Sequence, residues 1–140
     1  MRRPTARVTL HEIRAGANQF MRAAPGPEVA GVDAVTFTSD DGRSIPGRAY
    51  RATLGAPAPA IVFLHGGGFV FGDLDTHDAM CRLLVAGSGC TVLSVGYRLA
   101  PEHPYPAAVD DALAALRHLS REPASFGVRR GAIGVAGDRW

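Results

Sequence analysis

The spacing of hydrophobic and polar positions changes along the chain, and its first segment has the spacing of a helix. Apolar residues recur there every three or four positions, which predicts an amphipathic helix from about Thr9 to Ala23. Thr9 followed by Glu12 matches a capping box, so the helix is expected to begin at that point. Pro25-Gly26-Pro27 is expected to end it. The apolar stripe of this helix consists of Leu10, Ile13, Ala17, Phe20 and Met21.

Alternating positions follow and predict a hairpin. Apolar residues alternate with threonines over Ala34–Ser39, as in a half-buried strand. Asp40-Asp41-Gly42 is a turn signal that leads into a second strand over Ser44–Arg51. Because Pro46 has no N–H to give to a neighbouring strand, we expect this second strand to lie at a sheet edge.

Continuous apolar runs predict three further strands, over Ala60–Leu64, Cys90–Gly96 and Ala132–Ala136. Strands without alternation are typical of a sheet that helices cover on both faces. The alternation of these runs with helical patterns therefore predicts an α/β fold. We expect a mostly parallel sheet that carries the N-terminal hairpin and has helices on both faces.

Two helices are expected between these strands. The first begins at Asp75 or Thr76 and ends at Gly87 or Gly89. Its inward residues are expected to be Ala79, Met80, Leu83 and Leu84. The second has Pro106 near its first turn. Its inward residues are expected to be Val109, Leu113, Leu116 and Leu119.

Composition indicates an ordinary globular chain. It has 140 residues, of which 46% are hydrophobic and 20% charged, which is enough to build one core. The formal net charge of +2 is too small to indicate a nucleic-acid partner. No apolar run approaches the roughly 18 residues of a membrane span. Cys81 and Cys90 form no CxxC pair and are expected to be reduced, buried thiols of a cytoplasmic protein.

The residues that can carry chemistry are concentrated in the segment from His65 to Asp73, directly after an expected buried strand. Three consecutive glycines, Gly66 to Gly68, leave no side chains between the backbone and a ligand. Their N–H groups can then point at a developing negative charge. A flexible loop is the alternative interpretation. The strand before the glycines and the acidic helix start after them favour an oxyanion hole of the HGGG type.

Three motifs occur in order: His65-Gly66-Gly67-Gly68, the segment Gly72-Asp73-Leu74-Asp75-Thr76-His77-Asp78, and Tyr97-Arg98-Leu99-Ala100-Pro101-Glu102. Together they resemble the hormone-sensitive-lipase-like carboxylesterase family of α/β-hydrolases. The resemblance implies the N-terminal half of that fold. Residues 1–30 would then be a cap-type helix and linker, and residues 31–140 a partial hydrolase domain that ends at the nucleophile elbow.

The resemblance also implies roles for single residues. The backbone N–H groups of Gly67 and Gly68 would bind the carbonyl oxygen of an ester as it becomes an oxyanion, and His65 would brace the loop. Phe69 and Phe71 would line an acyl pocket or pack beneath the loop. The implied substrate is a small carboxylic ester, and neither a cofactor nor a metal ion is expected.

The nucleophilic serine of this family follows a Gly-Asp pair, but this chain has Arg139 and Trp140 after Gly137-Asp138. The sequence therefore predicts a half-built site, in a chain that is truncated at the nucleophile and inactive alone. The alternative is a non-catalytic module in which Arg139, beside the glycine N–H groups, holds an anion. The uncovered edge of the last strand is expected to promote self-association.

Overall fold

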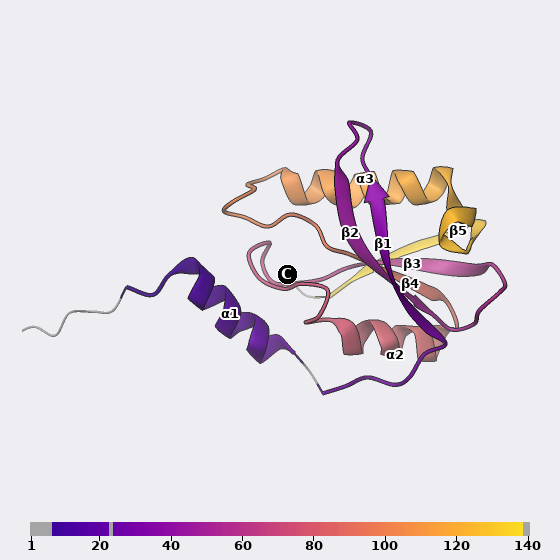
Figure 1. The fold of residues 1–140 in the computed structure, drawn as a ribbon, viewed down its shortest axis with the longest axis horizontal. Coiled ribbons are helices and arrows are strands. Elements are labelled where there is room, and N and C mark those ends of the chain that lie inside the picture. The colour runs from indigo at the N-terminus through magenta and orange to yellow at the C-terminus, as the bar shows by residue number, and fades with distance from the viewer. Residues whose placement is uncertain (1–6, 23, 139–140) are drawn as a thin grey trace, which may run out of the picture.

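The computed structural model describes residues 7–22 and 24–138 and shows helices on both sides of one sheet (Figure 1). Five strands lie in the order β1-β2-β4-β3-β5. β3, β4 and β5 run parallel, and the antiparallel β1–β2 hairpin joins them through β2. The predicted α/β architecture is thus confirmed. The elements are α1 (Leu10–Met21), β1 (Gly31–Thr38), β2 (Ser44–Arg51), β3 (Ala58–Leu64), α2 (Asp78–Ser88), β4 (Thr91–Val95), α3 (Ala107–Arg121), the 3-10 helix η1 (Pro123–Phe126) and β5 (Val128–Gly137).

β2 lies inside the sheet, so the expectation that Pro46 marks an edge strand was wrong. β2 pairs with β1 along its whole length and with β4 from Gly47 to Tyr50. Pro46 comes just before the first residue paired with β4, and its carbonyl accepts a hydrogen bond of 2.8 Å from the N–H of Gly96. The proline therefore sits where the β2–β4 pairing ends, and its missing N–H interrupts no pair within that ladder.

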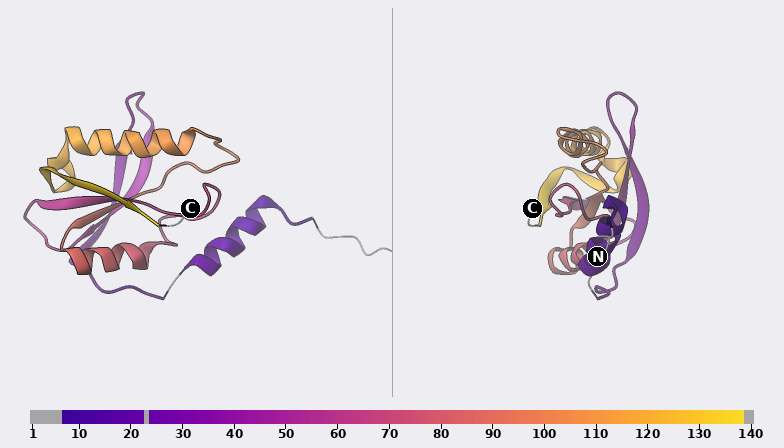
Figure 2. Two further views of the ribbon diagram at one scale, coloured as in Figure 1. Left: turned by 180° about the vertical axis from the view of Figure 1, so that it is seen from behind. Right: turned by 90° about the vertical axis from the view of Figure 1, so that its left-hand side faces the viewer.

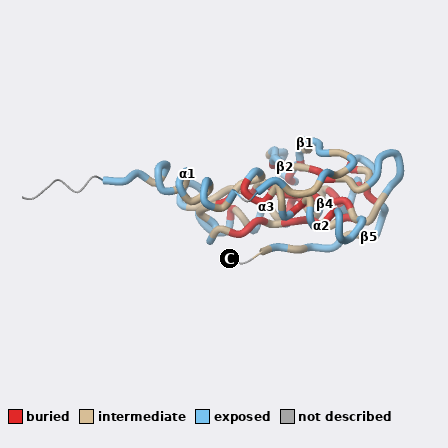
Figure 3. The backbone as a smooth tube through the Cα atoms, turned by 90° about the horizontal axis from the view of Figure 1, so that it is seen from below, coloured by how far each residue is buried: buried red, intermediate tan, exposed pale blue. Residues whose placement is uncertain are grey.

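The two faces of the sheet carry separate cores. Neighbouring side chains of a strand point to opposite faces. Val62 and Leu93 accordingly pack in the cluster on the α3 face, whereas Phe63 and Val92 pack in the cluster on the α2 face. β4 is buried at every position and lies in the middle of the buried region in Figure 3. These central strands fix the position of the loop that leaves the end of β3.

α2 begins and faces differently from the expectation. Its N-cap is His77, which makes no side-chain capping bond. Its buried residues are Cys81 and Val85, and the expected Leu84 packs partly buried against the same cluster. Met80 and Leu83, expected to face inward, are instead 42% and 58% exposed. The predicted end is confirmed, because Gly89 caps the helix with φ of 70°.

α3 packs through small residues. Ala114, Ala115 and the expected Leu119 are buried, whereas Val109 and Leu113 are 40% and 43% exposed. The alanines bring the helix close to the strands. The larger side chains of the expected stripe therefore lie beside this contact, along a groove described below.

α1 is confirmed with its capping box. The Thr9 hydroxyl oxygen accepts from the N–H of Glu12 at 3.2 Å, and the Glu12 carboxylate accepts from the N–H of Thr9 at 2.8 Å. Ala23, the expected last residue, lies outside the described residues. None of the 12 residues of α1 is buried, and Phe20 is 91% exposed. Figure 2 shows α1 to one side of the layered body, so its apolar stripe enters neither core.

Within the described residues, no helix combines the length and the hydropathy that a membrane span requires.

Candidate functional site

The glycine loop, residues 65–73, follows β3. At two of its positions only glycine fits, because the neighbouring atoms leave no room for a Cβ atom. A Cβ atom on Gly67 would lie 2.2 Å from the carbonyl oxygen of Phe71. One on Gly72 would lie 2.5 Å from both the carbonyl oxygen of Gly66 and Nδ1 of His65. Both glycines also have positive φ, of 128° and 87°. The loop is therefore close-packed at these points.

The tip of the loop presents backbone donors. The N–H groups of Val70 and Phe71 turn back to the carbonyl oxygen of Gly67, at 3.2 and 2.9 Å. In contrast, the N–H groups of Gly67 and Gly68 donate to no group within the described part of the chain. A Cβ on Gly68 would meet nothing within 4 Å, so space for a ligand atom is open there. Two donors are thus available next to an unfilled volume.

His65 lies under the loop and is only 1% exposed. Its Nδ1 is 2.9 Å from the carbonyl oxygen of Gly66, so this nitrogen carries the proton and donates it. The His65 ring stacks on that of Tyr97 with centroids 4.3 Å apart, and the Tyr97 hydroxyl donates to the carbonyl oxygen of His65. Burial lowers the pKa of His65 and keeps the imidazole neutral. His65 therefore contacts both the loop and Tyr97 while its ring stays neutral.

Asp138, directly after β5, ties the end of that strand to the loop. One carboxylate oxygen accepts from the N–H of Gly66, and the other is 2.8 Å from Nε2 of His77. Nδ1 of His77 is 2.8 Å from the Thr76 hydroxyl, and the N–H of Thr76 donates to the Asp73 carboxylate at 2.8 Å. These bonds join the residue after β5 to the segment from Gly66 to His77, which lies 61 to 72 positions earlier in the sequence, and sequence reasoning missed them.

The residue expected at the nucleophile position, Arg139, and its neighbour Trp140 lie outside the described residues.

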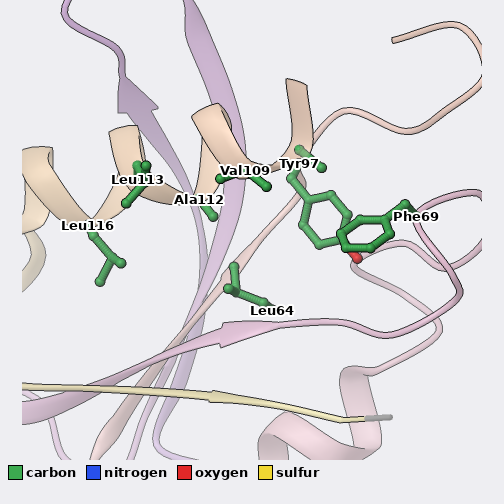
Figure 4. A pocket seen from close by; sticks show the side chains of 8 residues that line it. Leu64, Phe69, Tyr97, Val109, Ala112, Leu113 and Leu116 are labelled. Carbon is green, nitrogen blue, oxygen red and sulfur yellow. The ribbon is translucent and has the colours of Figure 1, made fainter. Parts of the chain in front are cut away.

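An apolar groove of about 260 Å³ opens between the loop and α3 (Figure 4). Its lining comprises Leu64, Phe69, Tyr97, Ala108, Val109, Ala112, Leu113 and Leu116. A second hollow of about 270 Å³ adjoins it and is lined by Gly68, Phe69, Ala100, His103, Tyr105, Pro106, Ala108 and Val109. Phe69, which has a φ of 65°, lines both volumes and is drawn at the same end of the groove as Tyr97 in Figure 4. Phe71, its partner in the sequence hypothesis, lines neither.

Other reactive side chains do not form a second site in the described residues. No three His, Cys, Asp or Glu side chains gather there as metal ligands. Both cysteines are free. Burial raises the pKa of the Cys81 thiol to about 12, which makes it an unreactive core group. Cys90 is only partly buried, so its expected burial was wrong.

Comparison with known proteins identifies relatives over most of the chain. The family described as alpha/beta hydrolase fold matches residues 61–139. Carboxylic ester hydrolase LipN of Mycobacterium tuberculosis is 49% identical over 131 residues, which are 89% of this chain and 34% of LipN. An ethyl acetate hydrolase of Pseudomonas putida is 42% identical over 107 residues, which are 74% of this chain and 34% of that enzyme. The chain thus spans about a third of the length of these relatives.

Solved structures agree over most of the chain. An ester hydrolase from the metagenome of Lake Arreo superposes with a TM-score of 0.84 at 39% identity, covering 95% of this chain and 45% of the other. An esterase of Pyrobaculum calidifontis superposes with a TM-score of 0.83 at 39% identity, covering 94% and 44%. With the family match, the sequence relatives and the shared fold together, the chain belongs to the α/β-hydrolase fold family, among its hormone-sensitive-lipase-like carboxylesterases.

Proposed function

We propose that the glycine loop is the oxyanion-binding half of a serine carboxylesterase site that acts on small carboxylic esters. The observation that carries this proposal is the pair of N–H groups at Gly67 and Gly68 that no described residue accepts, with open space at Gly68 on an otherwise close-packed loop. A donor of this kind typically contributes about 3–4 kcal/mol to stabilising the transition state of acyl transfer. Relatives named as ester hydrolases support the same reaction.

The apolar groove is the proposed place for the hydrocarbon part of the ester. Its lining residues are apolar apart from the hydroxyl of Tyr97, and that hydroxyl already donates to the carbonyl oxygen of His65. Phe69 is the proposed contact residue, because it lines both the groove and the hollow at Gly68. Phe71 is left with packing beneath the loop, the other role that the sequence suggested.

His65 is proposed to brace the loop and not to act as the general base. A base must reach the nucleophile to accept its proton, yet the His65 ring is only 1% exposed and lies beneath the loop, bonded to the carbonyl oxygen of Gly66. We further propose that residues 1–30 serve as a cap-type segment for the part of the hydrolase domain that residues 31–140 form.

Residues 1–140 do not supply the nucleophile at the expected place, because Arg139 follows Gly137-Asp138. We propose that these residues alone do not hydrolyse esters.

A non-catalytic anion site is the second candidate, favoured by the same two donors together with the cation of Arg139 in the sequence. The two candidates differ in whether Arg139 is needed for binding.

Two experiments test the proposal. A chimera that joins residues 1–138 to a serine and the C-terminal part of the Pyrobaculum calidifontis esterase is expected to hydrolyse a short-chain p-nitrophenyl ester. The chain itself and its Arg139→Ser variant are expected to give no turnover above buffer, because an unactivated serine is a poor nucleophile. A folded but inactive chimera would contradict the proposal.

The second experiment titrates the chain with acetate while the amide resonances of Gly67 and Gly68 are observed. Under the esterase proposal, any shift is the same in the Arg139→Ala variant. Loss of the shift in that variant would support the anion-site candidate instead.

Self-association through β5 is a further part of the proposal. β5 is the last strand in the sheet order and pairs with β3 alone among the described strands, and its Val135 is 57% exposed. Such an edge offers backbone N–H and C=O groups to another chain. Analytical ultracentrifugation is expected to show dimers that Val135→Lys weakens. A monomer at all concentrations would contradict this part.

We also propose a cytoplasmic location, which the two free thiols support, because disulfides are rare in that reducing compartment. The small net charge gives no reason to add a nucleic-acid partner.

A further inference from the structure

α1 is joined to the glycine loop by the guanidinium of Arg14. Nε of Arg14 donates to the carbonyl oxygen of Val70 at 2.9 Å, and Nη2 donates to that of Ala100 at 3.1 Å. The two Nη atoms also bind the two carboxylate oxygens of Glu102, at 3.0 and 2.9 Å. One side chain thus bridges the glycine loop and the loop that follows β4. Such a planar, two-pronged ion pair fixes geometry as well as adding energy.

Asn18 makes a second bridge from the same face of α1, one helical turn after Arg14. Its side-chain carbonyl oxygen accepts from the N–H of Gly72 at 2.8 Å, and its amide nitrogen donates to the Asp73 carboxylate at 3.2 Å. The returning limb of the glycine loop is therefore bound at Val70 by one side chain and at Gly72 by the other.

These polar contacts are not a by-product of apolar packing. None of the residues of α1 is buried, and Ile13 is 47% exposed. The Arg14 side chain itself is 23% exposed, so its hydrogen bonds are partly shielded from water. A helix that buries no residue depends on contacts of this kind for its position.

The bound positions closely follow Gly67 and Gly68, whose N–H groups no described residue accepts. Phe71, between Val70 and Gly72, closes the turn by donating its N–H to the carbonyl oxygen of Gly67 at 2.9 Å. From the loop that follows β4, the N–H of Ala100 donates to the carbonyl oxygen of Phe69 at 2.8 Å. Arg14 therefore binds Val70 of the glycine loop directly and holds Ala100, which in turn binds Phe69. Phe69 and Val70 directly follow Gly67 and Gly68 in the chain. A donor aids an oxyanion only when it is held in place beforehand.

We propose that Arg14 and Asn18 are positioning residues that fix the glycine loop in the conformation in which no described residue accepts the N–H groups of Gly67 and Gly68. The placement of α1 then determines how rigidly these two donors are held. The catalytic meaning of this inference rests on the proposed oxyanion function. The coupling of helix to loop does not, and it can be measured in the chain without any substrate.

The test is amide hydrogen exchange with amide chemical shifts, on the full 140-residue chain. In Arg14→Ala, exchange at Phe71, Gly72 and Ala100 is expected to accelerate by about tenfold or more, because several charge-assisted hydrogen bonds are lost. The resonances of Gly67 and Gly68 are expected to move. Amides of β4 are expected to exchange at the original rate.

Three further variants refine the test. Arg14→Lys keeps the charge but not the two-pronged geometry, so it is expected to restore the loop only in part. Asn18→Ala is expected to act mainly at Gly72, whose acceptor it removes. Glu102→Gln leaves Arg14 in place and is expected to loosen Ala100. Arg22→Ala is the matched control, because Arg22 is exposed and its nearest carboxylate, on Asp75, is 3.9 Å away.

Two results would overturn the inference. One is exchange in Arg14→Ala that equals that of Arg22→Ala at Phe71, Gly72 and Ala100. The other is an equal loss of protection in the loop and in β4, which would mean that Arg14 stabilises the fold as a whole. Neither readout involves ester hydrolysis, so failure here is distinguishable from failure of the proposed function, which the chimera tests.

Discussion

The base and the tip of the glycine loop differ in how their polar groups are satisfied. At the base, His65, Gly66 and Gly72 are buried and each is hydrogen-bonded: His65 to Gly66 and Tyr97, Gly66 also to Asp138, and Gly72 to Asn18. At the tip, Gly67 and Gly68 keep N–H groups that no described residue accepts. A loop that was merely flexible would lack the close-packed base. The contrast shows how a short glycine segment can keep backbone donors available: the hydrogen-bonded base holds the tip in place.

The largest effect is expected from filling the base. In Gly72→Ala the new Cβ would lie 2.5 Å from the Gly66 carbonyl oxygen and from the His65 ring, at a φ of 87°. Overpacking together with an unfavourable backbone is expected to cost roughly 3 kcal/mol or more of unfolding free energy. Urea denaturation measures it. A loss below about 1 kcal/mol would mean that the base is not close-packed.

Next in size is the loss of one bond beneath the base. Tyr97→Phe removes the hydroxyl that donates to the carbonyl oxygen of His65 and leaves that buried acceptor without this donor. The expected cost is about 1–3 kcal/mol of unfolding free energy. The same urea experiment measures it, with Tyr105→Phe as control, because Tyr105 is 87% exposed. Equal effects of the two substitutions would contradict the buried bond.

A smaller effect is expected at the tip. Gly68→Ala matches Gly72→Ala in chemistry and also has a positive φ, of 62°, but nothing lies within 4 Å of its Cβ. Only the backbone cost of roughly 1–2 kcal/mol is then expected. The difference between the two alanine variants therefore measures the contrast between base and tip. Equal destabilisation would remove that contrast.

The smallest effect concerns pH. Burial lowers the pKa of His65, so the unfolded chain binds a proton more readily than the folded one. The stability due to neutral His65 is complete above its unfolded pKa, about 6.5, and falls as pH drops toward its folded pKa. Between pH 7 and 6 one such proton costs less than about 1 kcal/mol. His77 and Asp138 lie nearby, so the comparison uses His65→Asn, which is expected to flatten the curve. An unchanged curve would contradict the assignment.

Patterns in the sequence predicted the architecture because buried parallel strands are continuous apolar runs. They failed at the helix faces, where Ala114 and Ala115 of α3 meet the sheet and the larger Val109 lines the groove. A hydrophobic stripe does not say which of its members packs and which borders a cavity. The glycine segment was recognisable because few residues other than glycine tolerate its φ values.

The partners of the loop could not be predicted in this way. Asp138 binds the N–H of Gly66, and Arg14 binds the carbonyl oxygen of Val70, across 72 and 56 positions of the chain. Single polar side chains that act over such distances leave no periodic signal. Only the folded arrangement brings them together, so the hydrogen-bond partners of the glycine loop could be identified only from the structure.

The most direct test of the central claim observes the two donors themselves. In the chimera with the restored serine, a phosphonate that reacts covalently with that serine places a negatively charged oxygen where the oxyanion would form. The amide protons of Gly67 and Gly68 are expected to move downfield on reaction, as they do when they donate to an anion. The amide proton of Gly72, already bonded to Asn18, is expected to stay. A complete adduct that leaves Gly67 and Gly68 unshifted would contradict the account.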